Sequence, residues 1–161
     1  MRLLPIPNRL LGEKMGAHPY WYFVEYQKNV GNALNALRER EFRAGRYNPV
    51  TPFIDFPIAA NSPAPGPQHS SPQGALASAE EEGTRSILDI SAVSDTPDFC
   101  VASPLDAKVL KSVYGTTTPS RAQVEKDMAF MESIERGHCV YFFIYENGEP
   151  KEIFFGGFSF D

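Results

Sequence analysis

Cysteine is nearly absent from this 161-residue sequence, which contains only Cys100 and Cys139. They lie far apart and neither belongs to a C-x-x-C pair, so the spacing of a zinc site or of a redox dithiol is missing. The three histidines, His18, His69 and His138, also lack metal-ligand spacing. We therefore expect no metal and no other cofactor, and two reduced thiols in a cytoplasmic protein.

Long apolar runs and excess positive charge are absent as well. The longest apolar stretches, 139–145 and 153–160, are far shorter than the roughly 20 residues of a membrane-spanning helix. The net charge of −5 opposes the electrostatic attraction that drives binding to nucleic acids and to anionic lipids. We therefore expect no membrane span and no binding to DNA or RNA, and we expect another protein as the partner.

Familiar catalytic signatures are missing too. The chain has no G-x-S-x-G and no G-x-G-x-x-G, which excludes the common hydrolase and dinucleotide-binding patterns. Its length and its 42% hydrophobic residues are typical of one globular domain. We expect residues 15–161 to form this domain and residues 1–14 to be an N-terminal extension, with Met1 and Met15 as alternative starts.

The first half of the chain predicts one strand, one helix and a long loop. Residues 20–27 are rich in aromatic and β-branched side chains, which indicates a strand. Asn29 can cap the helix that follows, and Gly45 is placed to end it. Residues 57–72 are dense in proline and show no hydrophobic period, which predicts a loop inside the domain.

The second half predicts three helix starts, another strand and a hairpin. Ser71-Pro72, Ser103-Pro104 and Ser120 each resemble the capped start of a helix. Residues 84–90 supply apolar content typical of a strand, and Asn147-Gly148 between two apolar segments is a strong β-hairpin signal. The expected fold class is therefore α+β, with a mostly antiparallel sheet of about four strands, helices packed on one face and a C-terminal β-hairpin.

Positive charge gathers where the first predicted helix ends, and this is the most site-like feature of the sequence. Arg43 and Arg46, with Tyr47 and Asn48, lie where the chain leaves the helix, and arginine forks suit carboxylate or phosphate. The alternative is a solvated charged face, in which the cations complement the helix dipole. His69, in the proline-rich loop, is a candidate proton carrier or ligand contact.

Two aromatic features suggest contact surfaces. Strand alternation places Tyr22 and Tyr26 on one face of the first strand, as a binding platform or as a face buried under helices. The apolar segment 153–160 is core or an edge strand that forms a homodimer, because Pro150 favours an edge position.

These features together favour a non-enzymatic protein-binding or regulatory module of unknown partner. The alternative is a small hydrolase or transferase that holds an anionic substrate with Arg43 and Arg46 and uses His69 or a carboxylate as general base. The sequence leaves open whether the protein is an enzyme.

Overall fold

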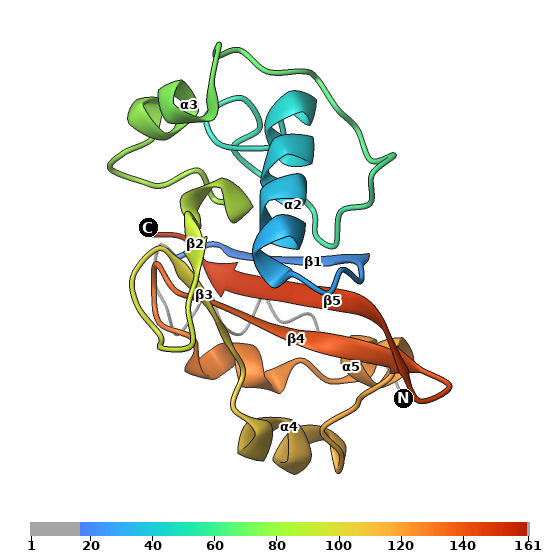
Figure 1. Ribbon diagram of the computed structural model, residues 1–161. Coiled ribbons are helices and arrows are strands. Elements are labelled where there is room, and N and C mark those ends of the chain that lie inside the picture. Colours follow the sequence, from blue (N-terminus) through green and yellow to red (C-terminus); the bar gives the residue numbers. More distant parts are fainter. Residues whose placement is uncertain (1–16, 161) are drawn as a thin grey trace.

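The computed structural model describes residues 17–160, and this part of the chain has an α+β fold. A five-stranded mixed sheet runs through its middle with the strand order β1-β5-β4-β3-β2. Helices lie above and below the sheet (Figure 1). No helix in residues 17–160 combines the length and the apolar character that crossing a bilayer requires.

The elements have the following bounds. The strands are β1 (Pro19–Glu25), β2 (Ala92–Val93), β3 (Val101–Pro104), β4 (Cys139–Glu146) and β5 (Glu149–Phe158). The α-helices are α2 (Val30–Ala44), α3 (Pro72–Ser78), α4 (Ala107–Tyr114) and α5 (Arg121–Lys126). Two short 3-10 helices are η1 (Ile87–Asp89) and η2 (Ala129–Ser133).

The first strand, the first helix and the hairpin confirm the predictions for those segments. The Asn29 side chain accepts a hydrogen bond from the backbone of Asn32 at the start of α2, and Gly45 ends the helix with φ 75°. Asn147 and Gly148, which join β4 to β5, both have positive φ, as the tight turn of such a hairpin requires. Local sequence signals therefore decide these three elements.

The prediction of about four mostly antiparallel strands is wrong. The sheet has five strands, and β3 pairs in parallel with both β2 and β4. The parallel pairing of β3 with β4 follows from the connection between them, because α4, α5 and η2 carry the chain back to the same end of the sheet. The two added strands, β2 and β3, are too short to produce a hydrophobic pattern.

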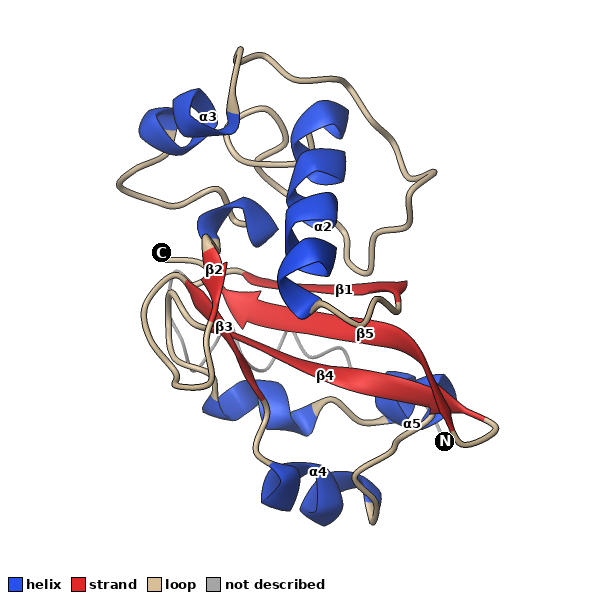
Figure 2. Ribbon diagram, viewed as in Figure 1, coloured by secondary structure: helices blue, strands red, loops and turns tan. Residues whose placement is uncertain are grey.

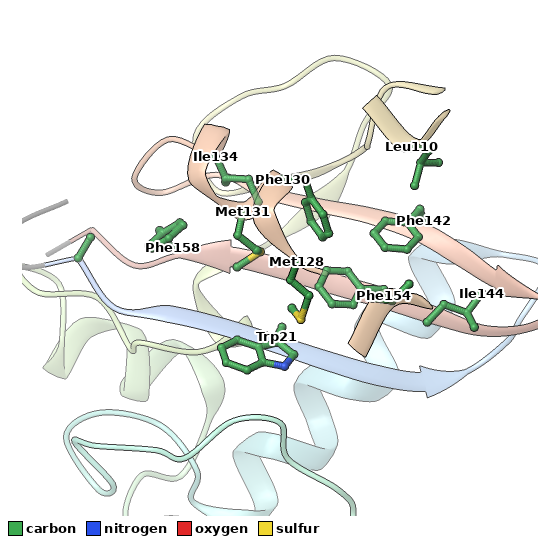
Figure 3. Close-up of a cluster of buried hydrophobic side chains, with 12 residues drawn as sticks. Trp21, Leu110, Met128, Phe130, Met131, Ile134, Phe142, Ile144, Phe154 and Phe158 are labelled. Carbon is green, nitrogen blue, oxygen red and sulfur yellow. The ribbon is translucent and has the colours of Figure 1, made fainter. Parts of the chain in front are cut away.

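Helices also cover both faces of the sheet and not the single face that was predicted. Figure 2 shows α2 on one side and α4 and α5 on the other. The reason lies in β5, where Phe154 and Phe158 enter one core cluster while Ile153 and Phe155 enter the other. A strand that is apolar on both faces needs a cover on each of them. Figure 3 shows the cluster on the face of the sheet opposite α2, which includes Trp21.

Two further segment predictions need correction, whereas the helix start at Ser120 is confirmed. Residues 84–90 form no strand but contain η1, where the Ser86 side chain caps the backbone of Leu88. Ser103-Pro104 ends β3, and α4 begins after Asp106, whose side chain accepts from Lys108. The helix that begins after Ser120 ends at Lys126, and η2 follows. Ile87, Leu88 and Ile90 of the first segment are fully buried, but tertiary packing decides the backbone that carries them.

The C-terminal strand is not an edge strand. β5 pairs with β1 on one side and with β4 on the other, so a homodimer through a C-terminal edge is wrong. Gly157 allows this central position, because a Cβ atom there would overlap the carbonyl oxygen of His138 and lie 2.8 Å from the hydroxyl of Tyr20. The free edges of the sheet belong to β1 and β2.

We expect Gly157→Ala to lower the free energy of unfolding by about 2 kcal/mol or more, because the backbone of β4 cannot move away without breaking the ladder. Gly74→Ala is the matched control. Its added methyl group meets only ordinary contacts at 3.6 Å and beyond within α3, so it should leave stability unchanged or raise it by about 0.5–1 kcal/mol. Urea unfolding of both variants checks this, and equal effects would contradict the close approach at Gly157.

Candidate functional site

The two arginines of the predicted anion site have separate partners. Arg46 is buried, and its Nε and Nη2 donate to the two carboxylate oxygens of Glu41 at 2.8 and 2.7 Å. Its Nη1 donates to the carbonyl oxygen of Ser62 at 2.8 Å. Arg43 is exposed instead and pairs with Glu39 at 2.6 Å. All three guanidinium nitrogens of Arg46 are therefore engaged within the protein.

Side-chain contacts hold together distant parts of the loop region, and they involve Tyr47, Asn48 and His69. The hydroxyl of Tyr47 lies 2.8 Å from Nδ1 of His69, and the Tyr47 ring stacks on Phe42 with centroids 5.9 Å apart. Asn48 donates from its side chain to the carbonyl oxygen of Gly83 at 3.0 Å. The structure thus brings Tyr47 and His69 together, and their contact ties residues near α3 to the end of α2.

Tyr22 and Tyr26 lie on the same face of the sheet, as strand alternation predicts, in the core cluster that α2 covers. Tyr22 is fully buried, and its hydroxyl accepts a hydrogen bond from the backbone N–H of Ile87 at 3.2 Å. The Tyr26 ring packs edge-on against Phe143 with centroids 5.4 Å apart. Tyr22 is therefore a core anchor with no exposed ring.

A buried acid lies beside this core. Oδ1 of Asp89 accepts from the backbone N–H and the hydroxyl of Thr84 at 2.7 and 2.8 Å, whereas Oδ2 is buried without a hydrogen-bond partner. Burial raises the pKa of Asp89 to about 6, against the two hydrogen bonds from Thr84 and the charge of Arg38, which lower it. Asp89 is therefore a buried acid that ties Thr84 to η1.

The outer edge of β1 has no strand partner in the five-stranded sheet. The carbonyl oxygen of His18 accepts from Ser159 N, and Tyr26 N donates to the carbonyl oxygen of Lys151, so the even-numbered residues of β1 bond to β5. In an antiparallel pair the alternate residues point their N–H and C=O groups the other way. Trp21 and Phe23 therefore direct their backbone groups away from the sheet.

A groove of about 280 Å³ lies at the beginning of this edge. Residues from three segments line it: the start of β1, a loop that follows α2, and a more distant loop that contributes one arginine. They are His18, Pro19, Trp21, Pro52, Phe53, Ile54, Asp55, Phe56 and Arg85. The groove is therefore largely apolar, with the rings of Trp21, Phe53 and Phe56, a single carboxylate and a single guanidinium.

Phe53 projects from the rim of the groove and is 78% exposed. Its ring lies 6.2 Å from the ring of His18 and 5.7 Å from the guanidinium carbon of Arg85. Arg85 itself donates to the carbonyl oxygen of Pro52 at 3.1 Å and pairs with Glu82 at 3.2 Å. An exposed apolar ring is thus held in position by contacts on two sides.

Phe56 forms the wall of the groove beside the strand. Its ring lies 5.7 Å from that of Trp21 and 5.3 Å from that of Tyr22. Because Trp21 and Tyr22 point to opposite faces of the sheet, a ring that contacts both lies next to the edge of β1. Phe56 therefore fixes how closely the loop approaches the strand.

The sequence predictions missed this groove. Residues 51–56 contain two phenylalanines and an isoleucine just before the proline-rich loop, and an apolar cluster in a segment without period is the one local signal available. Arg85 is distant from these residues in the sequence and meets them only in the folded chain.

Comparisons with protein-family models, with curated proteins and with solved structures give no match. The groove must therefore be interpreted from its own residues.

We expect Arg46→Ala to lower the free energy of unfolding by about 3 kcal/mol, because it leaves the buried carboxylate of Glu41 with Arg40 as its one remaining cation. Arg43→Ala, at an exposed pair, should change stability by less than about 0.5 kcal/mol. Thermal and urea unfolding of the two variants check this. A stable Arg46→Ala protein would show that the ion pair is dispensable and would return Arg46 to the candidate anion site.

We expect the stability of the protein to depend on the proton of Asp89. The folded protein keeps this proton up to about pH 6, whereas an unfolded aspartate releases it near 3.8, so folding takes up a proton between these values. Stability should therefore fall on the order of 2–3 kcal/mol from pH 4 to pH 7 relative to Asp89→Asn, which does not titrate. Urea unfolding of both proteins between pH 4 and 7 checks this, and parallel curves would contradict it.

Proposed function

We propose that the chain is a non-enzymatic protein-binding module and that its contact surface is the groove beside β1. The observation that carries the proposal is the exposed ring of Phe53, which His18 and Arg85 hold at the rim of a hollow with aromatic walls. Large aromatic side chains that lie in place before binding are typical of the residues that dominate interface energies. The unpaired backbone groups of β1 continue the same surface.

The alternative of an enzyme with an anionic substrate has less support. Arg46 is buried and uses three of its five N–H donors for Glu41 and Ser62, so its charge is already compensated and its side chain is out of reach of an anion in solution. Burial raises the pKa of the Cys100 thiol, and the carboxylates of Asp89 and Asp98 raise it further, which keeps the thiol protonated and weakly nucleophilic at neutral pH. The groove therefore remains the best-supported contact surface.

We expect Phe53→Ser to abolish partner capture and to leave the fold intact. The matched control is Phe99→Ser, since Phe99 is the other large apolar side chain in residues 17–160 that is more than half exposed, and it stacks on Phe160 away from the groove. Wild type and both variants are used as bait in the native lysate, and the proteins retained are quantified by mass spectrometry. A partner retained by wild type and Phe99→Ser is expected to be lost with Phe53→Ser.

Titration with that purified partner gives the size of the effect. The Phe53→Ser substitution should weaken binding by roughly 30-fold or more, because a central aromatic anchor contributes about 2 kcal/mol or more. Thermal unfolding should change little, because Phe53 is mostly exposed. Equal affinities for wild type and Phe53→Ser, or no specific partner of wild type, would contradict the proposal.

A further inference from the structure

We infer that the partner binds as an extended basic strand that pairs with the outer edge of β1 and so continues the five-stranded sheet. This inference rests on the proposed binding function and names the binding mode and the chemistry of the partner. Its occupant is a short segment of another protein, with lysine or arginine near both ends.

The first support is the hydrogen-bonding state of β1. The outward-facing N–H and C=O groups of Trp21 and Phe23 make no hydrogen bond to any residue in the range 17–160. Backbone groups without a partner in the protein bond to water or to an added strand. An added strand supplies donors and acceptors at the right spacing.

The second support is the contrast between the two edges of the sheet. At the other edge, β2 has only two residues. The ladder between β2 and β3 ends with the hydrogen bond from Ser94 N to the carbonyl oxygen of Ala102, and β3 itself ends at Pro104, which has no N–H. Short strands and prolines are devices that prevent strand addition. β1 lacks them, since its seven residues pair with β5 in unbroken register and its one proline is the first residue.

The third support is the set of side chains around the β1 edge. On one face Arg121 lies 3.7 Å above the ring of Phe23, while Phe56 contacts both Trp21 and Tyr22 and so lies beside the edge itself, where an incoming strand must displace its ring. Phe53 projects near the beginning of the strand. An incoming strand therefore meets apolar and planar surfaces around its own alternating side chains, which favours β-branched residues at its centre.

The fourth support is charge. Asp55 in the groove and Glu25 at the far end of β1 are exposed, and neither forms an ion pair with another residue of the described range. The cations near them are already engaged, Arg85 by Glu82 and Arg121 by Glu152. The six residue steps of β1 span about 20 Å. Two cationic side chains separated by about the same length of extended peptide would complement both carboxylates.

A displayed library of random peptides of about 12 residues, long enough to span β1, tests the inference with the full chain as target. We expect selected peptides to carry Lys or Arg at two positions about six residues apart, with β-branched residues between them. On binding, the amide hydrogens of Trp21 and Phe23 should exchange with solvent at least ~10-fold more slowly, because they enter a ladder. The amides of Tyr20 and Tyr22, already bonded to β5, should change little.

Chemical variants of the selected peptides separate strand pairing from side-chain contact. Methylation of the alternate amides that face β1 should weaken binding ~10-fold or more, because it removes at least two hydrogen bonds, whereas methylation of the other alternate set should not. The protein variant Glu25→Gln with Asp55→Asn should weaken binding several-fold at low salt and reduce its salt dependence. Asp95→Asn, an exposed carboxylate on the loop between β2 and β3, is the control.

The outcomes distinguish this inference from the proposed function. If the selected peptides depend on Phe53, bind equally well after either methylation and leave the exchange at Trp21 unchanged, strand addition is overturned. That result would still support the groove as the contact surface. Peptides that bind equally well to Phe53→Ser would count against both. Selection of acidic or helical peptides, or of none, would overturn the inference. Slow exchange at Trp21 without peptide would also overturn the inference. Slow exchange that depends on protein concentration would indicate a second copy as the occupant, and slow exchange that is lost on removal of residues 1–16 would indicate that segment.

Discussion

The buried ion pair between Glu41 and Arg46 is the constraint on which the upper half of the molecule depends. A carboxylate with no exposed surface is tolerated only when a cation and hydrogen bonds compensate it, and Glu41 has both from Arg46 and one further bond from Arg40. To reach Glu41, the chain turns back directly after α2 through Gly45, whose φ is 75°. The direction in which the long loop leaves the helix is thus determined by this pair.

The same guanidinium group orders the loop itself. Its remaining nitrogen bonds to Ser62, and Gly66 N donates to the carbonyl oxygen of Ala44 at 2.8 Å, so a proline-rich segment is fastened to the helix end at two points. Between the end of α2 and Ser62 the chain carries Phe53 and Phe56 to the edge of β1. An exposed ring on a fastened loop loses less conformational freedom on binding than the same ring on a free loop.

The sequence predicts those elements that have a local cause, namely the Asn147-Gly148 turn, the Asn29 cap and the Gly45 stop. Arg43 and Arg46 show where local reasoning ends. Both lie near the end of the same helix in a charge-rich segment. Arg43 lies in its last turn and pairs with Glu39 in solvent, whereas Arg46 lies beyond Gly45 and is buried against Glu41. Residue type and spacing do not separate these outcomes, because burial depends on what packs over the turn.

The candidate groove was beyond prediction for a related reason. Phe53 and Arg85 are more than thirty positions apart in the chain, and they meet only because Arg85 bonds to the carbonyl oxygen of Pro52. The open edge of β1 also depends on the whole sheet. Residues 153–160 suggested an edge strand, but β1 and β4 enclose that segment on both sides, so the free edge passes to residues 19–25.

The position of β1 at the edge of the sheet determines which backbone groups a partner could reach. Tyr20 and Tyr22 of β1 are fully buried in the core beneath α2, so a shift of one residue in the register of β1 would move both rings to the opposite face, whose core is packed around other side chains, and is disfavoured. The core thereby fixes which backbone groups of β1 point outward. A partner strand that pairs with them gains affinity from the backbone alone, which is the same for every sequence. Discrimination between partners then rests on the side chains around the edge, chiefly Phe53 and the carboxylates of Asp55 and Glu25.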